Sequence, residues 1–429
     1  AASGHAVDAN LISQSLHSVT HCCAFGSLSP HIHTHSMLKQ SVTVLGSTGS
    51  IGTNTLDVIA RHPDRFSVFA LCAATQVETM LAQIQVHQPQ FAVMASEPHA
   101  RVLADRVRAA GLSPQVLSGV QAACDVASDE RVDSVMAAIV GAAGLSPCMA
   151  AAKAGKKIML ANKEALVVGG HCFMQAVKDG GAVLLPIDSE HSAVFQSLPE
   201  DRASWSIRVQ KIILTASGGP FRNRAVETLS QVTVAEACAH PNWVMGQKIS
   251  VDSATMMNKA LEVIEARYLF GVEPGQIEVV IHPQSVIHSM VQYHDASIVA
   301  QLGTPDMRVP IAYGLSWPER IVSGANPVNF LTVAPLTFET PDPRRFPGLP
   351  LAWQALEAAP GTTAVLNAAN EVAVAAFLGQ RIRFDQIHAV NLATLSQVLP
   401  GRSVCIEDLL AIDAESRSVA ELTVQSLSF

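Results

Sequence analysis

Long apolar runs are missing from the sequence, although 49% of its 429 residues are hydrophobic and only 15% are charged. The longest stretch without a charge near the middle of the chain, 134–152, is interrupted by Gly141, Gly144 and Pro147 and consists mostly of small residues. A membrane-spanning helix needs about 20 consecutive apolar residues. The stretch therefore predicts a buried strand and a turn, and the overall composition excludes a disordered chain.

An excess of positive charge is also missing, because the formal net charge is -8. Such a surface disfavours nucleic acid and anionic membranes as partners, and a phosphate-bearing ligand would need a local basic pocket. Eight cysteines are scattered without a Cys-x-x-Cys pair, and the adjacent Cys22 and Cys23 cannot form the usual structural disulfide. We therefore expect a reducing compartment, with the cytoplasm as the location.

Lys and Arg are absent from residues 1–36, which contain six histidines. A secretory signal would need a basic start and an unbroken apolar centre, and a mitochondrial transit peptide would be rich in Arg. Neither description fits. We interpret 1–36 as a leader or an added segment before Met37, where regular patterns begin, with metal capture by the histidines as an alternative role.

The chain length exceeds what one core usually supports, so several domains are expected. From Ser41 the segments SVTVL, GSTGSIG, TNTLDVIARHP and FSVFALCAA read as strand, turn, helix and strand. This alternation continues to KIMLAN and predicts an α/β fold with a parallel sheet over residues 37–187. Mixed strands and one strong helix at 252–270 then predict an α+β domain over 188–316. Proline-rich residues 317–350 read as a linker, and helical spacing predicts a C-terminal α-helical domain over 351–429.

A glycine-rich turn joins the first strand to the first helix. Gly46, Gly49 and Gly52 stand where backbone amides and the helix dipole can hold a pyrophosphate. A tight turn without a ligand is the alternative.

The second strand ends in Ala74, Thr75 and Gln76, without the carboxylate that holds an adenosine ribose in NAD-binding folds. This absence favours NADP. No Lys or Arg is adjacent to grip a 2′-phosphate, and Arg61 and Arg65 read equally well as solvated charges at a helix end.

Two carboxylates follow the strand AVLLPI, in the tetrad Asp188, Ser189, Glu190 and His191. If the backbone stays extended, Asp188 and Glu190 project to the same side, which would form a site for Mg²⁺ or Mn²⁺. A solvated turn or a helix cap is the alternative.

The predicted helix 252–270 has two different faces when each residue is turned by about 100°. The apolar stripe consists of Met257, Leu261, Ile264 and Tyr268, and the polar side of Asn258, Lys259 and Glu262. Glu265 lies about 60° away from Glu262 and is interpreted as structural. The alternative is a surface helix with a Lys–Glu pair and no role in a site.

The loop before this helix carries Trp243 with Pro241, Asn242 and Gly246, which suits a lid that excludes water. Ser253 and the helix N-terminus add donors for a phosphate.

Three further motifs have open interpretations. Ser217, with Gly218 and Gly219, either binds the same phosphate or forms a plain turn. Lys163, between Asn162 and Glu164, either meets a substrate oxygen or begins a helix. His282 and His288 are interpreted as structural, with a direct role as the alternative.

In order along the chain, GSTGSIG, ANKE, IDSEH, TASGGPF, HPNWVMGQKISVDSATMMNKALEVIEA and HPQSVIHSM resemble the signature motifs of the 1-deoxy-D-xylulose 5-phosphate reductoisomerase family, from about Ser41 to Ser418. The resemblance implies a Rossmann-like NADPH domain, a catalytic domain with a flexible flap, and a homodimer. It implies conversion of a small phosphorylated sugar, 1-deoxy-D-xylulose 5-phosphate, to 2-C-methyl-D-erythritol 4-phosphate with NADPH and Mg²⁺, Mn²⁺ or Co²⁺, in the non-mevalonate route to isoprenoids.

The resemblance also implies residue roles. The metal ligands would be Asp188, Glu190 and Glu262. The substrate would be held by these glutamates together with Lys163, Ser189, Ser217, His240, Ser253, Asn258 and Lys259, under Trp243 as a lid. The catalytic set would be Lys163, Asp188, Glu190, Glu262, His240 and Trp243. The cofactor would contact Gly46, Thr48, Gly49, Ser50, Ile51, Ala74, Thr75 and Gln76, with Asn162, Glu164 and Gly246 on the nicotinamide side.

One departure from the family is that Ala73, Ala74, Thr75 and Gln76 stand where the family usually shows Ala-Gly-x-Asn. A methyl group at Ala74 would crowd a backbone that only glycine tolerates at positive φ. Three rival functions are a metal-dependent sugar phosphate isomerase without a redox step, a semialdehyde dehydrogenase with Cys148 as nucleophile, and a non-catalytic nucleotide sensor.

Overall fold

The first βαβ unit of the computed structural model forms where the sequence predicts it. Strand β1 (Gln40–Leu45) pairs in parallel with β2 (Phe66–Ala73), and α1 (Ser50–Arg61) connects them. Val42 and Val44 are fully buried, as expected for a strand covered on both faces. Gly46 has φ +82°, and a Cβ there would lie 2.4 Å from the backbone oxygen of Ala138. Only glycine fits this turn without strain.

The structure describes residues 39–241, 243, 245–333 and 335–428. The expectations for the leader 1–36, with its histidines and Cys22 and Cys23, and for Met37 and Asn242 lie outside the described residues. Within the described residues, no helix has the length and apolarity to span a bilayer.

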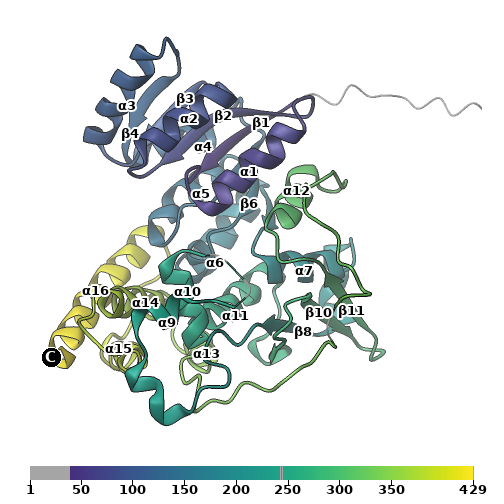
Figure 1. Ribbon diagram of the computed structural model, residues 1–429, viewed down its shortest axis with the longest axis vertical. Coiled ribbons are helices and arrows are strands. Elements are labelled where there is room, and N and C mark those ends of the chain that lie inside the picture. The colour runs from purple at the N-terminus through teal and green to yellow at the C-terminus, as the bar shows by residue number, and fades with distance from the viewer. Residues whose placement is uncertain (1–38, 242, 244, 334, 429) are drawn as a thin grey trace, which may run out of the picture. The chain divides into compact units, whose positions relative to one another are not determined.

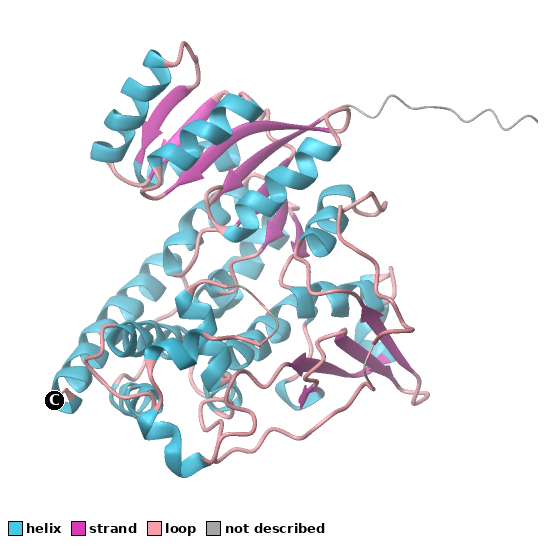
Figure 2. Ribbon diagram, in the orientation of Figure 1, coloured by secondary structure: helices cyan, strands magenta, loops and turns pink. Residues whose placement is uncertain are grey.

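A seven-stranded parallel sheet carries the N-terminal region, in the order β4-β3-β2-β1-β5-β6-β7. Helices cover both of its faces (Figure 2). The order reverses between β1 and β5, which is where α/β sheets of this type open a ligand crevice at the carboxyl ends of the strands. The remaining elements are α2 (Val77–His87), β3 (Phe91–Met94), α3 (Glu97–Ala109), β4 (Gln115–Ser118), α4 (Gly119–Ser128), β5 (Ser134–Ala137), η1 (Ala142–Gly144), α5 (Leu145–Lys153), β6 (Lys157–Leu160), α6 (Glu164–Gly180) and β7 (Val183–Pro186). The expected α/β class is confirmed.

A second, mixed sheet of four strands follows, in the order β11-β10-β8-β9. Strands β8 (Val209–Ala216) and β9 (Ile277–Ile281) are parallel, whereas β10 (Ile287–Tyr293) and β11 (Ile298–Leu302) run antiparallel to their neighbours. Between and around these strands lie α7 (Ser189–Ser197), η2 (Arg202–Ser204), α8 (Trp205–Arg208), η3 (Val226–Gln231), α9 (Val234–Cys238), η4 (Pro274–Gln276) and α12 (Arg308–Ser316).

Two expectations about this region are wrong. The helix predicted over 252–270 is two helices, α10 (Gln247–Thr255) and α11 (Met257–Phe270), because Met256 adopts a left-handed backbone with φ 63°. The chain after β7 also does not stay extended, since α7 begins at Ser189 with Asp188 as its N-cap residue. Asp188 therefore stands at the N-cap position of α7, although its side chain makes no capping hydrogen bond.

The C-terminal region is helical, as predicted, with α13 (Leu351–Glu357), α14 (Thr362–Leu378), α15 (Gln386–Gln397) and α16 (Ile406–Leu427) (Figure 1). The segment TTAVLNAANEVAVAAFL coincides with α14 residue for residue. Before it, the described residues of 317–350 contain turns and one isolated bridge between Ile281 and Glu339, with no longer strand or helix. The domain boundaries drawn from the sequence stay predictions.

Candidate active site

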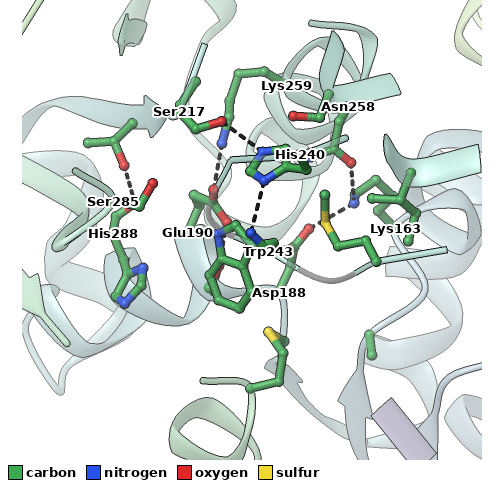
Figure 3. A pocket seen from close by; sticks show the side chains of 18 of the residues that line it. Lys163, Asp188, Glu190, Ser217, His240, Trp243, Asn258, Lys259, Ser285 and His288 are labelled. Carbon is green, nitrogen blue, oxygen red and sulfur yellow. Dashed lines mark hydrogen bonds and ion pairs between the residues drawn. The ribbon is translucent and has the colours of Figure 1, made fainter. Parts of the chain in front are cut away.

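A cavity of about 190 Å³ brings together residues that follow strands of the parallel sheet, residues of the second sheet, and residues of α10 and α11. Its lining includes the following predicted site residues: Ser50, Ile51, Lys163, Asp188, Ser189, Glu190, Ser217, His240, Trp243, Gly246, Ser253, Asn258 and Lys259. Figure 3 shows the side chains of Asp188, Glu190, Lys163 and Lys259 close together within it. Six separate segments of the predicted motif set thus meet at one site.

Three carboxylates converge, and two of them line this cavity. Asp188 and Glu190 come from the N-terminal end of α7, and Glu262 comes from α11. Each offers a carboxylate oxygen within 4.8 Å of those of the other two. Glu262 is fully buried, whereas the cavity reaches Asp188 and Glu190. Hard divalent cations prefer oxygen ligands of this kind, so the donor set fits Mg²⁺ or Mn²⁺.

Two ammonium groups accompany the carboxylates. Lys163 Nζ lies 3.0 Å from Asp188 Oδ2 and donates to Asn258 Oδ1 at 2.9 Å, while Lys259 Nζ lies 2.9 Å from Glu190 Oε1 and contacts Glu262. Burial alone would lower the pKa of each lysine. The neighbouring carboxylates outweigh that effect and raise it, so both lysines are charged.

The three carboxyl groups have different pKa values because only two lysine ammonium groups lie among the three carboxylates. Burial raises the pKa of Asp188, but the charge of Lys163 outweighs it and brings the pKa down to about 2. For Glu190, Lys259 likewise overcomes burial and lowers the pKa. Burial and the charge of Glu190 raise the pKa of Glu262 to about 8. A divalent cation would remove the repulsion that keeps Glu262 protonated near neutral pH.

A second group of potential metal ligands, Asp188, His191 and Glu265, lies deeper. His191 Nε2 lies 2.9 Å from the backbone oxygen of Glu262, and its Nδ1 lies 3.3 Å from Glu265 Oε2. His191 and Glu265 are fully buried and do not line the cavity. Burial lowers the pKa of His191 to about 4 and raises that of Glu265. This pair therefore lies beside the carboxylate site, where burial disfavours the charged form of both groups.

The cavity also offers hydroxyl and amide donors. His240 Nδ1 accepts from the backbone amide of Trp243 at 3.0 Å, so Nε2 carries the proton and donates to Ser217 Oγ at 3.0 Å. Ser217 Oγ also accepts from the Gly219 amide at 3.1 Å. With two donors already directed at its oxygen, Ser217 can direct its own hydrogen to an anion in the cavity. Figure 3 shows this chain from Ser217 through His240 to Trp243.

Comparisons with known proteins agree with this arrangement. A family model described as 1-deoxy-D-xylulose 5-phosphate reductoisomerase matches residues 42–170, one for its C-terminal domain matches 184–270, and another C-terminal model matches 302–419. The reductoisomerase of Dechloromonas aromatica (strain RCB) is 56% identical over 392 residues, covering 91% of this chain and 98% of that protein. That of Pseudomonas fluorescens (strain SBW25) is 58% identical over 389 residues, covering 89% and 97%.

The chain belongs to the 1-deoxy-D-xylulose 5-phosphate reductoisomerase family.

Solved structures of the reductoisomerase family have the same fold. A crystal structure of DOX-P reductoisomerase in complex with NADPH, fosmidomycin and magnesium has a TM-score of 0.87 and 44% identity, covering 90% of this chain and 99% of that one. The Zymomonas mobilis enzyme in complex with NADPH has a TM-score of 0.85 and 44% identity, covering 91% and 100%. The resemblance drawn from the sequence motifs is confirmed.

The glycine turn of this reductoisomerase-family chain reaches the same cavity through the N-terminal end of α1. Ser50 and Ile51 line the cavity, while Gly46, Thr48 and Gly49 form the turn before them. Ala74, Thr75 and Gln76 follow β2, the strand next to β1, and are exposed.

The expectation that Ala74 is strained is wrong. The described non-glycine residues with positive φ are Gln88, Met256, Ser285, Ala296 and Gln380. The loop after β2 thus takes a backbone that alanine adopts without strain.

Two residues expected at the nicotinamide make other contacts. Asn162 donates to the backbone oxygens of Gly141, at 3.0 Å, and Ile139, and it accepts from the Ala165 amide at 3.1 Å. Glu164 is buried against Lys248, with Oε1 2.9 Å from Nζ. Among the described residues that line the cavity, neither appears. Their contact with the nicotinamide stays a prediction.

The structure separates two histidines that the sequence treated alike. His282 is satisfied by backbone, with Nδ1 2.9 Å from Thr337 O and Nε2 accepting from the amides of Val286 and Ile287. His288 lines the cavity, with its ring centroid 6.5 Å from that of Trp243. Sequence reasoning also missed these lining residues: Met245, Ile249, Met256, Ser285, Ile287 and Met307. Apart from Met307, these residues lie within the motifs given above, but side chains that are mostly apolar carry no chemistry that marks them as lining a cavity.

Proposed function

We propose that the carboxylates of Asp188, Glu190 and Glu262 hold the divalent metal ion of this reductoisomerase. The enzyme converts 1-deoxy-D-xylulose 5-phosphate to 2-C-methyl-D-erythritol 4-phosphate with NADPH. The observation that carries the residue assignment is the convergence of three carboxylate oxygens within 4.8 Å at a cavity that the nucleotide turn also reaches. When bound, the metal supplies Lewis acidity toward the ketone and a neighbouring hydroxyl of the sugar, which permits rearrangement of the carbon skeleton.

The chain's own cations prepare this site. Lys163 and Lys259 neutralise Asp188 and Glu190, so the site carries less repulsion before the substrate and metal enter. Lys163 is also positioned between Asp188 and Asn258, where its ammonium can donate to a substrate oxygen. Charged donors of this kind form hydrogen bonds about twice as strong as neutral ones.

The phosphate of the substrate belongs beside the hydroxyl, amide and ammonium donors of the cavity. Ser217, Ser253, Asn258 and Lys259 line that cavity and supply hydroxyl, amide and ammonium donors. Binding energy from this remote group can orient the reacting carbons and close the Trp243 loop. His240 supports both the phosphate donors and the Trp243 loop, because its two ring nitrogens join Ser217 to the Trp243 backbone.

The position of the nucleotide turn favours a redox reaction over the non-redox isomerase. Ser50 and Ile51 share the cavity with the carboxylates, so a dinucleotide on this turn would extend toward the reacting carbons. Trp243 and the apolar Met245, Ile249 and Met307 would exclude water during hydride transfer. A nucleotide sensor would not need the carboxylate set.

The semialdehyde dehydrogenase alternative loses its nucleophile. Cys148 is fully buried in the core of the parallel sheet, and burial raises the pKa of its thiol to about 12. A catalytic cysteine needs the opposite environment, one that is accessible and lowers the pKa.

The decisive experiment follows NADPH absorbance with the pentulose phosphate and Mn²⁺ present. We expect oxidation of NADPH that depends on both sugar and metal, stops on chelation and returns with added Mn²⁺. Carbonyl rearrangement without NADPH oxidation would favour the isomerase. Alkylation of accessible thiols should leave the rate unchanged.

A homodimer and a cytoplasmic location remain part of this proposal. Strand β11 is the outer strand of the four-stranded sheet and exposes Ile298, Val299 and Leu302. An exposed apolar edge of this kind favours pairing with a second copy. Sedimentation or light scattering tests the mass in solution. The described cysteines Cys72, Cys124, Cys148, Cys172, Cys238 and Cys405 are free thiols, which agrees with a reducing compartment.

A further inference from the structure

A buried chain of polar side chains connects the C-terminal helices with the active site. It begins at Glu164, next to Lys163, and passes to Lys248 at 2.9 Å and from Lys248 to Asp252 Oδ2 at 2.9 Å. Asp252 Oδ1 then accepts from Asn370 Nδ2 at 2.7 Å, and Asn370 Oδ1 accepts from Asn391 Nδ2 at 3.3 Å. These five residues come from α6, α10, α14 and α15.

Each member of the chain is difficult to replace because its polar atoms are paired and, apart from Lys248 with a side chain 23% exposed, lie largely out of reach of water. Asp252 is 1% exposed, and Asn370 and Asn391 are fully buried. Both oxygens of Asp252 are used, one by an ammonium and one by an amide. Burial of such groups is unfavourable unless they are paired with good geometry. The network therefore fixes one orientation of α10 about its axis.

Helix α10 carries two parts of the proposed substrate site. Ser253, which lines the cavity, follows Asp252 directly, and Gly246, the N-cap residue of the helix, ends the loop that holds Trp243. The opposite side of α10 packs on α14, where Val251 and Ala254 share a core cluster with Ala369 and Ala373. An apolar contact alone tolerates small rotations, whereas the Asp252–Asn370 hydrogen bond does not.

We propose that Asn370 of the C-terminal region is a positioning residue for substrate binding, which acts through Asp252 to orient α10 and thereby Ser253 and the Trp243 loop. This inference rests on the proposed phosphate role of Ser253. Asn370 itself does not line the cavity. The C-terminal helices thus contribute to recognition of the sugar phosphate without touching it.

The test compares Asn370→Ala with Asn367→Ala in the purified enzyme. Asn367 is equally buried on α14, but its Nδ2 donates to Glu371 at 3.1 Å rather than to α10. Loss of the Asn370 donor should raise the KM for the sugar phosphate about tenfold, since a buried acceptor loses its partner. The dissociation constant of NADPH, measured by nicotinamide fluorescence, should stay within about twofold. Asn367→Ala should leave both constants near wild type.

An exchange of the Asp252 and Asn370 side chains tests whether substrate binding can be rescued. In Asp252→Asn alone, an amide replaces the carboxylate that faces both Asn370 and Lys248. This variant should also raise the KM for the sugar phosphate. The double variant Asp252→Asn with Asn370→Asp restores a donor and an acceptor, so its KM should return toward the wild-type value. A double-mutant cycle isolates this coupling. Circular dichroism and melting curves report whether each variant is folded.

Two results would overturn the inference. One is an unchanged KM in folded Asn370→Ala, and the other is an equal loss in Asn367→Ala without rescue by the reversed pair. Ser253→Ala separates the phosphate role of Ser253 from the positioning role of Asn370. If Ser253→Ala leaves the KM unchanged, the phosphate role of Ser253 is wrong. If it raises the KM and Asn370→Ala does not, only the positioning role fails.

Discussion

Nζ of Lys259 lies 2.9 Å from Oε1 of Glu190 and also contacts Glu262, the residue one helical turn further along α11. The ammonium group therefore competes with a metal ion for two of the three proposed ligands. It is also a proposed donor to the substrate phosphate. Removal of this one charge should change metal and substrate affinities in opposite directions.

Lys259→Gln tests this relationship. We expect Mn²⁺ to bind at least about tenfold more tightly, because a positive charge within a few ångströms of the cation is removed. The KM for the sugar phosphate should rise by about 10- to 100-fold as a charge-assisted hydrogen bond is lost. Calorimetry and steady-state rates measure the two constants. Lys211→Gln, which removes a partly exposed ammonium paired with Glu278, should change neither, and weaker Mn²⁺ binding in Lys259→Gln would contradict the competition.

Glu262→Gln and Glu265→Gln distinguish the two groups of potential metal ligands. Both residues are buried on α11, but only Glu262 belongs to the group that includes Glu190. Glu262→Gln should lower turnover more than about 100-fold while the fold survives. Burial raises the pKa of Glu265 and so favours the neutral form that Gln resembles, and Glu265→Gln should therefore retain turnover within about tenfold. A reversal of these two effects, with both proteins folded, would place the metal against His191 and Glu265.

Which parts of this site can be predicted from the sequence depends on whether the pattern that indicates each residue is local in the chain. The glycine turn and α14 were predictable because their patterns are local: Gly46 allows one close backbone approach, and the apolar period of 362–378 continues without a break. The break at Met256 was not predictable. The apolar period continues through it, and only tertiary packing fixes its left-handed backbone.

Other parts of the site depend on contacts between distant segments. Met307 enters the cavity from the start of α12, with no motif around it. Glu164 was expected at the nicotinamide, yet Lys248 draws it into a buried pair that no spacing in the sequence reveals. The motifs thus predict the polar groups that define the reaction, while the apolar lining and the supporting ion pairs require the folded chain.

Metal affinity should depend on pH through Glu262. Burial and the charge of Glu190 raise its pKa to about 8, well above the ordinary 4.5. Below pH 8 the metal-free enzyme carries a proton on Glu262 that the cation must displace. The apparent affinity for Mn²⁺ should therefore fall about tenfold per pH unit below 8 and level off above it. Calorimetry at pH 6, 7, 8 and 9 measures the slope, and Glu262→Gln should remove it.

The same shift affects the stability of the metal-free enzyme. A group with a raised pKa in the folded state stabilises fully below its unfolded pKa, and this contribution is lost as the pH rises through the folded pKa. The Glu262 contribution is therefore present near pH 4.5 and lost by about pH 8. Melting temperatures with and without Mn²⁺ should diverge as the pH rises. Parallel curves would show that Glu262 does not ligate the ion.

A substitution just after β2 should increase the selectivity for NADPH over NADH. Ala74, Thr75 and Gln76 are exposed there and supply neither a carboxylate for a ribose nor a cation for a 2′-phosphate. Gln76→Arg should tighten NADPH binding about tenfold through charge-assisted hydrogen bonds, with little effect on NADH. Gln115→Arg adds the same charge at the start of β4, at the amino ends of the parallel strands rather than at their carboxyl ends, and should leave both constants unchanged. Equal tightening of NADPH and NADH by Gln76→Arg would show that the new guanidinium reaches the pyrophosphate, which both cofactors share, rather than the 2′-phosphate.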